Sequence, residues 1–392
     1  MNNPSKLSDT DLCVMCGMCL PHCPTYQIYQ TETESPRGRI ALMQSIDQHK
    51  IKADSAALKH IDHCLGCLNC ESICPSGVPY GKLIDEFRDQ YSDLIKKPLF
   101  SKFILNQLKK NNGIARLSQV ASKPLIRQTL ELSGKLTGIP SGFISENSPD
   151  FADFYPTDST SKGQVSIFAG CTGKINDHQT LTASLMLINQ LGFDVLLPQQ
   201  AACCGAIHQH NGQQQTASEL LSHTKTQLLQ HKSSVILFLS PACGAFLSQL
   251  KNTKILDIRT FLDEQLQQQA LRFSTPTKAI VLHESCSQRN HLKLTSANRK
   301  LLAHIPDIKI LTSSQPSLCC GAGGLQSINY PEQAKQLAEK KYQSFDFTHS
   351  NLLISDNIGC SLHMKSAFSA YNSDIEILHP VSLLARQLIT GE

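Results

Sequence analysis

The sequence predicts a protein of mixed α+β and α/β class, in which a mostly helical N-terminal domain precedes two duplicated α/β domains with parallel sheets. Three observations indicate this arrangement. A run of four cysteines ending in proline occurs twice near the N-terminus, 51 residues apart. A second set of cysteines repeats at a spacing of 115 to 117 residues from position 171 onward. Short apolar runs alternate with helical stretches through this second part, as in parallel βαβ units.

The N-terminal cysteines follow the pattern Cys-x2-Cys-x2-Cys-x3-Cys-Pro in both copies. This run is typical of bacterial ferredoxins with two [4Fe–4S] clusters, in which three cysteines bind one cluster and the fourth binds the other. A zinc site needs only four thiolates, and a disulfide framework belongs to small exported domains, so neither explains eight cysteines in register. We therefore predict two [4Fe–4S] clusters, the first held by Cys13, Cys16, Cys19 and Cys74, the second by Cys23, Cys64, Cys67 and Cys70.

The order of these motifs divides the 392 residues into four parts. We predict a two-cluster ferredoxin-type domain over 1–95, a basic helical linker over 96–162, a first Cys-Cys-Gly domain over 163–275 and a second over 276–392. The start of the chain lacks the apolar core of a signal peptide, and no apolar stretch reaches the length of a membrane span. We therefore expect the protein to be cytoplasmic, with its 16 cysteines reduced and free to hold metal.

The linker is strongly basic. Residues 95–136 hold nine lysines and arginines against one acid, interleaved with Leu and Ile at helical spacing. Two interpretations stay open: the charges are simply solvated, or they form a docking face for an anionic membrane surface or an acidic partner subunit. The net charge of +4 for the whole chain is too small to indicate nucleic acid, and the absence of Trp removes a stacking platform for single strands.

Each α/β repeat holds four cysteines, two of them in a Cys-Cys-Gly loop. Because every cysteine follows a strand or lies in the loop soon after it, the four should converge at the carboxyl edge of a parallel sheet. Three interpretations stay open: reduced core cysteines, a further iron–sulfur centre in at least one repeat, or a thiol-exchange site. The cysteines are Cys171, Cys203, Cys204 and Cys243 in the first repeat, and Cys286, Cys319, Cys320 and Cys360 in the second.

Histidine distinguishes the two repeats. Three residues beyond the last cysteine, the first repeat has Phe246 and the second has His363. Imidazole can replace thiolate as an iron ligand, so His363 is a candidate ligand beside Cys360, although a lone histidine is more often a polar neighbour. His283 and His208 show no pattern beyond an ordinary neighbouring or surface role. No nucleotide-binding glycine motif and no catalytic triad occurs, so we predict no catalytic residue here and expect a partner to carry the substrate-oxidising cofactor.

Together these features resemble the iron–sulfur subunits of bacterial glycolate oxidase over essentially the full length. The resemblance rests on the cysteine runs, on SPRGRI between them, on CPSGVPYGKLID, on the paired Cys-Cys-Gly repeats and on NIGCSLH. It implies an electron-transfer subunit that accepts electrons from FAD-containing 2-hydroxy-acid oxidase subunits, which convert glycolate to glyoxylate, and passes them toward quinone. It also implies a peripheral position on the cytoplasmic face of the inner membrane.

Other families share this layout. The iron–sulfur subunits of anaerobic glycerol-3-phosphate dehydrogenase and of D-lactate dehydrogenase are similar, so the donor substrate stays open. The repeats are also similar to those of heterodisulfide reductases, which end in Cys-x2-Cys. Here Phe246 and His363 replace that last cysteine, which argues against heterodisulfide-reductase catalysis. A thiol/disulfide redox enzyme and a scaffold that uses its repeats only structurally are the alternatives to an electron carrier.

Overall fold

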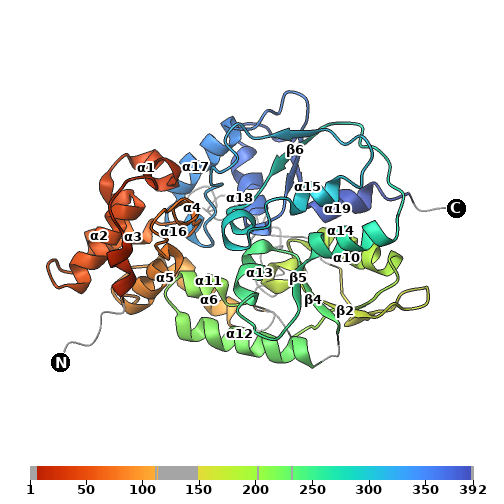
Figure 1. Cartoon of the computed structure of the whole chain (residues 1–392), viewed down its shortest axis with the longest axis horizontal. Helices are drawn as coiled ribbons and strands as arrows, with labels where there is room; N and C mark the ends of the chain where they lie inside the picture. Colours follow the sequence, from red (N-terminus) through yellow and green to blue (C-terminus); the bar gives the residue numbers. More distant parts are fainter. Residues whose placement is uncertain (1–6, 111–112, 114–148, 201–202, 231–232, 390–392) are drawn as a thin grey trace, which may run out of the picture.

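A computed structural model describes residues 7–110, 113, 149–200, 203–230 and 233–389. Within these residues, a helical N-terminal domain lies beside two α/β domains, as Figure 1 shows in red to orange, yellow to green and blue-green to blue. The predicted fold class, helical first and then duplicated α/β with parallel sheets, is confirmed. None of the described helices is long and apolar enough to cross a membrane.

The N-terminal domain consists of short helices around the cysteine loops. Its elements are η1 (Ser8–Leu12), η2 (Leu20–His22), α1 (Pro24–Tyr29), η3 (Glu32–Glu34), α2 (Pro36–Asp47), α3 (Ser55–Asp62), α4 (Asn69–Ser72) and α5 (Tyr80–Gln90). Ser35 begins α2, since its hydroxyl accepts a hydrogen bond from the Gly38 amide and Pro36 occupies the first helical position. Buried Met43, Ile61 and other apolar side chains of α2, α3 and α5 form the core.

The first α/β domain is built on a five-stranded sheet of order β1-β3-β2-β4-β5. Its strands are β1 (Phe154–Tyr155), β2 (Gln164–Phe168), β3 (Asp194–Leu196), β4 (Val235–Phe238) and β5 (Ile255–Asp257). Only β1 pairs antiparallel, with β3; the other pairs are parallel. The helices are α9 (Gly170–Gly173), α10 (His178–Gln190), α11 (Ala206–His210), α12 (Gln214–Leu229), α13 (Pro241–Leu247) and α14 (Ile258–Gln268).

The second α/β domain repeats this topology in a fully parallel sheet of order β7-β6-β8-β9. Its strands are β6 (Ile280–His283), β7 (Ile310–Thr312), β8 (Leu352–Ser355) and β9 (Glu376–Leu378). Its helices are the π-helix η5 (Ser287–His291), α15 (Ala297–Leu302), α16 (Gln326–Asn329), α17 (Pro331–Gln343), α18 (Ile358–Phe368) and α19 (Pro380–Arg386). In both sheets the strand before the first cysteine lies at the centre, so the cysteines gather at the carboxyl edge.

One hydrophobic core joins the two α/β domains. Buried side chains of both sheets and of α10, α14, α15 and α19 form a single cluster that includes Ile167, Leu187, Leu282 and Leu383. Because each sheet turns one apolar face toward this shared core, the repeats pack as one body. The opposite face of each sheet packs against a separate cluster that includes its own cysteines.

The N-terminal domain is locked to the others by buried polar contacts. Asp62, which is 0% exposed, accepts hydrogen bonds from Lys97 Nζ at 2.6 and 2.7 Å and from the Tyr330 hydroxyl at 2.6 Å, and lies 3.4 Å from Arg88. Gly212 packs so close to α5 that a Cβ there would lie 2.3 Å from the Arg88 carbonyl oxygen. The domain boundaries predicted from the sequence stay a prediction, but the N-terminal domain and the α/β domains pack directly against each other.

Candidate iron–sulfur sites

The two N-terminal cysteine loops have the same backbone shape. Met15 and Gly17 turn through the left-handed region with φ of 56° and 81°, and their counterparts 51 residues on, Gly66 and Leu68, have φ of 62° and 56°. Non-glycine residues rarely adopt this conformation, so its recurrence at equivalent positions indicates a backbone that the surrounding structure holds in place. Such turns bring successive cysteines to one side of the loop, as ligation of a single cluster by three cysteines requires.

Two cavities of the N-terminal domain are lined by thiols. One is lined by Cys13, Cys16, Cys19 and Cys74, and the other by Cys23, Cys64, Cys67 and Cys70. Cys70 lines both cavities, so they lie side by side. Each cavity therefore holds the four cysteines that the sequence assigns to one cluster, including the exchange of the fourth cysteine between the two loops.

The two thiol sets differ in exposure. Cys16 is exposed, and the other three cysteines of its set are partly buried, whereas Cys23, Cys64, Cys67 and Cys70 are all buried. Burial raises the pKa of the Cys67 and Cys70 thiols well above the ordinary value. A cysteine binds metal as the thiolate, so these buried groups suit a site where a cationic centre replaces their protons. The donor sets fit two iron–sulfur clusters.

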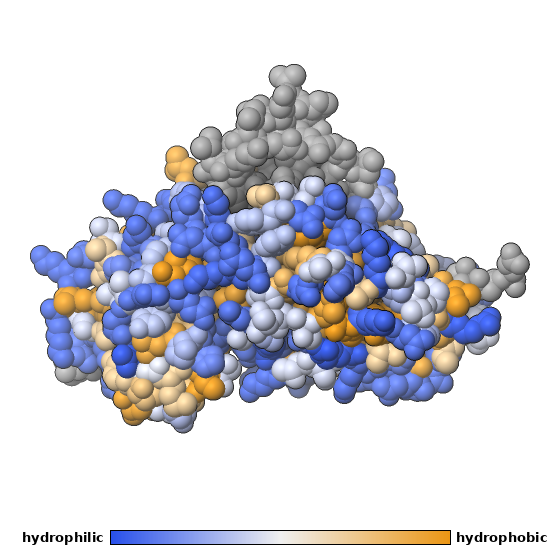
Figure 2. Space-filling view, turned by 90° about the horizontal axis from the view of Figure 1, so that it is seen from above, coloured by the Kyte–Doolittle hydropathy of each residue, from blue (hydrophilic) through white to orange (hydrophobic). Residues whose placement is uncertain are grey.

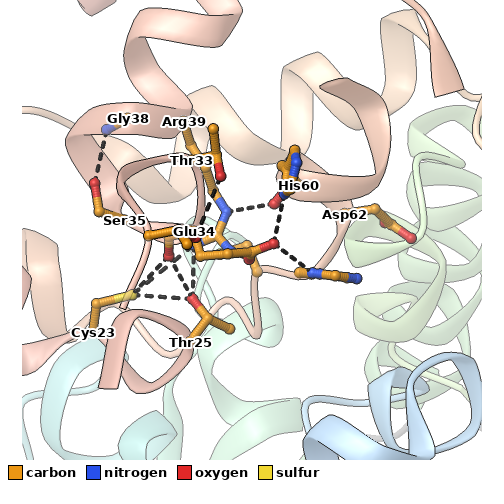
Figure 3. A network of polar contacts seen from close by, with 12 residues as sticks. Cys23, Thr25, Thr33, Glu34, Ser35, Gly38, Arg39, His60 and Asp62 are labelled. Carbon is orange, nitrogen blue, oxygen red and sulfur yellow. Dashed lines mark hydrogen bonds and ion pairs between the residues drawn. The ribbon is translucent and has the colours of Figure 1, made fainter. Parts of the chain in front are cut away.

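A buried polar network adjoins Cys23 (Figure 3). Arg39 Nη1 lies 3.9 Å from Cys23 Sγ, and Arg39 Nη2 donates to Glu34 Oε2 at 2.6 Å. The ring nitrogens Nδ1 of His60 and His63 each lie 2.7 Å from Glu34 Oε1. Burial alone would lower the pKa of Arg39, but the surrounding acidic groups, Cys23 and Glu34 among them, raise it above its ordinary value. A permanent positive charge therefore lies beside a cysteine of the second set.

In each α/β domain the four cysteines also converge, at the carboxyl edge of the sheet. In the second domain Cys320 Sγ lies 3.0 Å from Cys360 Sγ, and Cys286 is hydrogen-bonded to Cys319. In the first domain, hydrogen bonds connect the thiols in the order Cys171, Cys203, Cys204 and Cys243. The expectation that four thiols meet at one place in each repeat therefore agrees with the observed geometry.

The backbone of each Cys-Cys-Gly loop leaves no room for a side chain at the glycine position. Gly205 and Gly321 have φ of 98° and 94°, and a Cβ would lie 2.6 Å from the Ala217 carbonyl oxygen in one loop and 2.8 Å from that of Ala334 in the other. A side chain would be strained by the conformation and would collide with the following helix. The loop can therefore press the paired cysteines against the helix only with glycine at this position.

Comparison with known proteins agrees with this geometry. Residues 9–78 match the family described as the 4Fe-4S dicluster domain, and residues 165–248 and 280–365 match the cysteine-rich domain family. The chain is 29% identical to the probable glycolate oxidase iron-sulfur subunit of Bacillus subtilis, covering 90% of this chain and 88% of the relative. It is 27% identical to the glycolate oxidase iron-sulfur subunit of Escherichia coli, covering 91% and 89%.

The chain is a homologue of the glycolate oxidase iron–sulfur subunits. The resemblance stated from the sequence motifs is thereby confirmed, as is the combination of a dicluster domain with two cysteine-rich domains. A more distant relative is one of the subunits of the dihydromethanophenazine:CoB–CoM heterodisulfide reductase of Methanosarcina barkeri, 22% identical over 98% of this chain and 95% of its own length. The shared layout of these families was expected from the repeats.

The dicluster domain contacts the second cysteine-rich domain through its second cysteine loop. Asn290 of η5 donates to the Cys67 carbonyl oxygen at 2.7 Å, and Nε2 of His291 lies 3.1 Å from the Gly66 carbonyl oxygen. The Cys67 thiol interacts electrostatically with Cys286 and Cys319. The second thiol cavity therefore borders the cysteines of the second cysteine-rich domain, whereas the first cavity does not share this border in the described contacts.

The histidines of the second cysteine-rich domain are placed differently from the sequence expectation. His363 Nε2 lies 3.4 Å from the Ala334 carbonyl oxygen, and burial lowers its pKa to about 4. Among the described residues, His283 is the histidine whose ring nitrogen falls within 4.8 Å of both the Cys320 and Cys360 thiols. From the sequence we expected an ordinary neighbouring or surface role for His283, and its exposure of 2% agrees with the first of these and not with the second.

The basic linker lies only partly within the described residues. Its helix α6 (Leu99–Leu108) buries Ile104 and Leu108 against Ile175 and Leu325 of the two cysteine-rich domains. Lys97 is not solvated, because its ammonium group is paired with Asp62 inside the protein. Lys96, Lys102, Lys109 and Lys110 are exposed. Arg116, Lys123, Arg127, Glu131 and Lys135 lie outside the described residues, so the docking face stays a prediction.

Sequence reasoning missed Arg39 and Glu34, and it gave His283 only an ordinary role. Arg39 and Glu34 lie in the segment between the two cysteine runs, and the only available signal was a charged pair close to a helix start. His283 ends β6, at the position that Phe168 occupies in β2. Comparing the two repeats residue by residue, beyond their cysteines, would have revealed this exchange of phenylalanine for histidine.

Proposed function

We propose that the chain is the iron–sulfur electron-transfer subunit of a flavin-dependent glycolate oxidase complex. The proposal is carried by the two adjoining cavities, one lined by four thiols and the other by five, with Cys70 shared between them. [4Fe–4S] clusters bound there would supply one-electron transfer. The proposed ligand sets are Cys13, Cys16, Cys19 and Cys74 for the first cluster, and Cys23, Cys64, Cys67 and Cys70 for the second.

Residues of the dicluster domain suit the second site to accept negative charge. The Tyr80 hydroxyl donates to Cys64 Sγ at 3.7 Å, and Arg39 approaches Cys23 Sγ at 3.9 Å. Hydrogen bonds and positive charge at the sulfurs favour the more negative, reduced state of an iron–sulfur site. These contacts support a role in accepting an electron at the buried site.

The exposed first site is the proposed entry point for electrons. Leu12, Val14, Met15 and Met18 surround its cysteine loop and are 41 to 67% exposed. Exposed apolar side chains in a group mark interaction surfaces. In Figure 2 apolar side chains gather at several places on a largely polar face, one of them at the end that the dicluster domain forms. We propose that the FAD-containing partner docks over this loop, which brings its flavin close to Cys16.

The remaining parts of the proposal concern partners and destination. The two relatives are named as iron–sulfur subunits of glycolate oxidase, which supports assembly with other subunits. We propose FAD-containing oxidase subunits as the electron donor, glycolate or a related 2-hydroxy acid as their substrate, and quinone as the acceptor. Exposed Lys102 on α6, and exposed Lys109 and Lys110 directly after it, support a peripheral position at the cytoplasmic face of the membrane. Reversal of Lys109 and Lys110 to Glu should then weaken binding to anionic vesicles.

Reconstitution tests the proposal. Anaerobically prepared chain should show two [4Fe–4S] signals by EPR and no glycolate oxidation by itself. Mixed with a glycolate-oxidising flavoprotein, it should support quinone reduction when glycolate is added. The variant C16S should lose this activity, whereas S76A, which changes a residue that lines the same cavity without a thiol, should keep it. Quinone reduction that proceeds equally with C16S would contradict the proposal.

The same preparation separates the alternatives. Electron flow from a glycerol-3-phosphate- or lactate-oxidising flavoprotein, but not from a glycolate-oxidising one, would reassign the donor substrate. Reduction of a disulfide by the isolated chain would favour the thiol/disulfide enzyme, which the heterodisulfide reductase relative supports. Unchanged electron flow in C204S and C320S would mean that the cysteine-rich domains serve as a scaffold.

A further inference from the structure

His283 is a buried histidine without a hydrogen-bond partner in the described structure. It ends β6, is 2% exposed, and neither Nδ1 nor Nε2 meets a donor or acceptor among the described residues. A neutral imidazole carries one donor and one acceptor. Leaving a buried polar group unsatisfied costs about 1 to 3 kcal/mol, so such groups call for an explanation. The position of the ring supplies one.

The ring points into a group of thiols. One nitrogen of His283 and the sulfurs of Cys320 and Cys360 all lie within 4.8 Å of one another, and the two sulfurs are 3.0 Å apart. Cys286 and Cys319 are hydrogen-bonded to each other and interact electrostatically with Cys360. Imidazole nitrogen together with thiolate sulfur is the donor set that zinc and iron centres use in proteins.

A buried lysine supplies positive charge to this group. Lys341 of α17 is 1% exposed, and its ammonium lies 4.8 Å from the centre of the Phe345 ring, which in turn contacts the His283 ring edge to face. The charge of Lys341 interacts with Cys319, Cys320 and Cys360. The Lys341 ammonium donates to the Gln315 carbonyl oxygen at 3.5 Å and has no carboxylate partner among the described contacts. Four thiolates around a divalent metal would give this buried cation an anionic neighbour, since their summed negative charge exceeds that of the metal.

The first cysteine-rich domain provides an internal comparison. It has the same four cysteines, but Phe168 takes the place of His283 at the end of the equivalent strand. Thr224 occupies the place of Lys341, with its hydroxyl donating to the Cys203 carbonyl oxygen at 2.8 Å. Two polar groups that face the thiols in the second domain are thus absent from the first. The duplication has kept the cysteines and changed their surroundings.

We propose that the second cysteine-rich domain holds a metal centre with mixed ligands, in which His283 joins Cys320 and Cys360, and that the first domain lacks this centre. Cys286 and Cys319 are placed to complete the ligand set. The centre would border Cys67 of the second thiol cavity. This inference goes beyond the proposed function, which needs only the dicluster domain, and it names a ligand that the Cys-Cys-Gly pattern does not contain.

Metal analysis of the full chain, prepared anaerobically, tests the inference. Wild-type protein should contain zinc or iron in excess of the about eight irons of two [4Fe–4S] clusters, and elemental analysis identifies which metal it is. X-ray absorption at the edge of that metal should show imidazole scattering if it is zinc; if it is iron, pulsed EPR should show coupling to a histidine nitrogen. Metal in excess without any imidazole signature would overturn the assignment of His283.

Matched variants locate the centre. H283F, which gives the second domain the residue of the first, should lose the excess metal while the EPR signals of the dicluster domain persist. H283C should retain it, because a thiolate replaces the imidazole, and F168H should leave the metal content unchanged. Equal metal content in H283F and wild type, or no excess in wild type, refutes the inference. The dicluster signals report separately on the proposed function, and the wild-type spectroscopy stands even if H283F fails to fold.

Discussion

Removal of the Asp62 charge is the sharpest test of how the domains are held together. The carboxylate is fully buried and has Lys97, Arg88 and Tyr330 as partners, the last from the second cysteine-rich domain. In D62N the shape is kept, but two buried cations lose their counter-charge. Breaking a buried ion pair on one side costs about 3 to 5 kcal/mol. Since whole domains are stable by about 5 to 15 kcal/mol, this loss should be severe.

The assay is urea unfolding of the anaerobic holoprotein, followed by circular dichroism and by the visible absorbance of the bound clusters. The matched control is D9N, which breaks the pair between Asp9 and Lys82 at 2.8 Å. The Lys82 side chain is 56% exposed, so water screens the pair and this change should destabilise the protein far less than D62N. If D62N were no more destabilising than D9N, the buried junction would not hold the domains as argued.

Three further perturbations follow from the structure. E34Q removes a buried negative charge near Cys23 and should raise the potential of the cluster proposed at the second site in an EPR redox titration, whereas exposed E32Q should leave that potential nearly unchanged. G212A should lower the urea midpoint by more than G77A, because both have positive φ but only Gly212 meets backbone. Hydrogen bonds from Arg386 of α19 lower the pKa of Glu376, so the pair of these two residues stabilises the fold above about pH 4.3 and loses its effect as the pH falls through the lowered pKa. Both side chains are about half exposed. In urea unfolding, E376Q should therefore cost less than about 1 kcal/mol at pH 7 and nothing at low pH.

The sequence could predict features that depend on local spacing. Three cysteines on one turn can meet a common centre whatever the rest of the chain does, and the same spacing recurs in both copies. The duplication of the α/β domains was likewise visible, because strands and cysteines recur in a fixed register. The grouping of Cys74 with the first loop and of Cys23 with the second followed from the ferredoxin pattern, and the cavities contain the same groups.

Features that depend on tertiary contacts were out of reach. His363 looked like the better ligand because it stands three residues from Cys360, yet its ring nitrogen lies against the Ala334 carbonyl oxygen. His283, at the end of β6, is the histidine whose ring lies beside the thiols among the described residues. Lys97 looked like one charge among many on a linker, but it crosses 35 positions of sequence to reach Asp62. Charge count and spacing carry no information on which lysine the fold will bury.

The unequal burial of the two thiol sets predicts that they differ in sensitivity to oxygen. Dissolved oxygen and peroxide reach the loop of Cys16 directly, whereas Cys67 and Cys70 are shielded by protein. Oxidative damage should therefore begin at the outer set and spare the inner one for longer, and a bound oxidase subunit covering that loop would act as its shield. With the two clusters bound as proposed, aerobic isolation of the chain without its partner should give molecules that retain only the inner cluster.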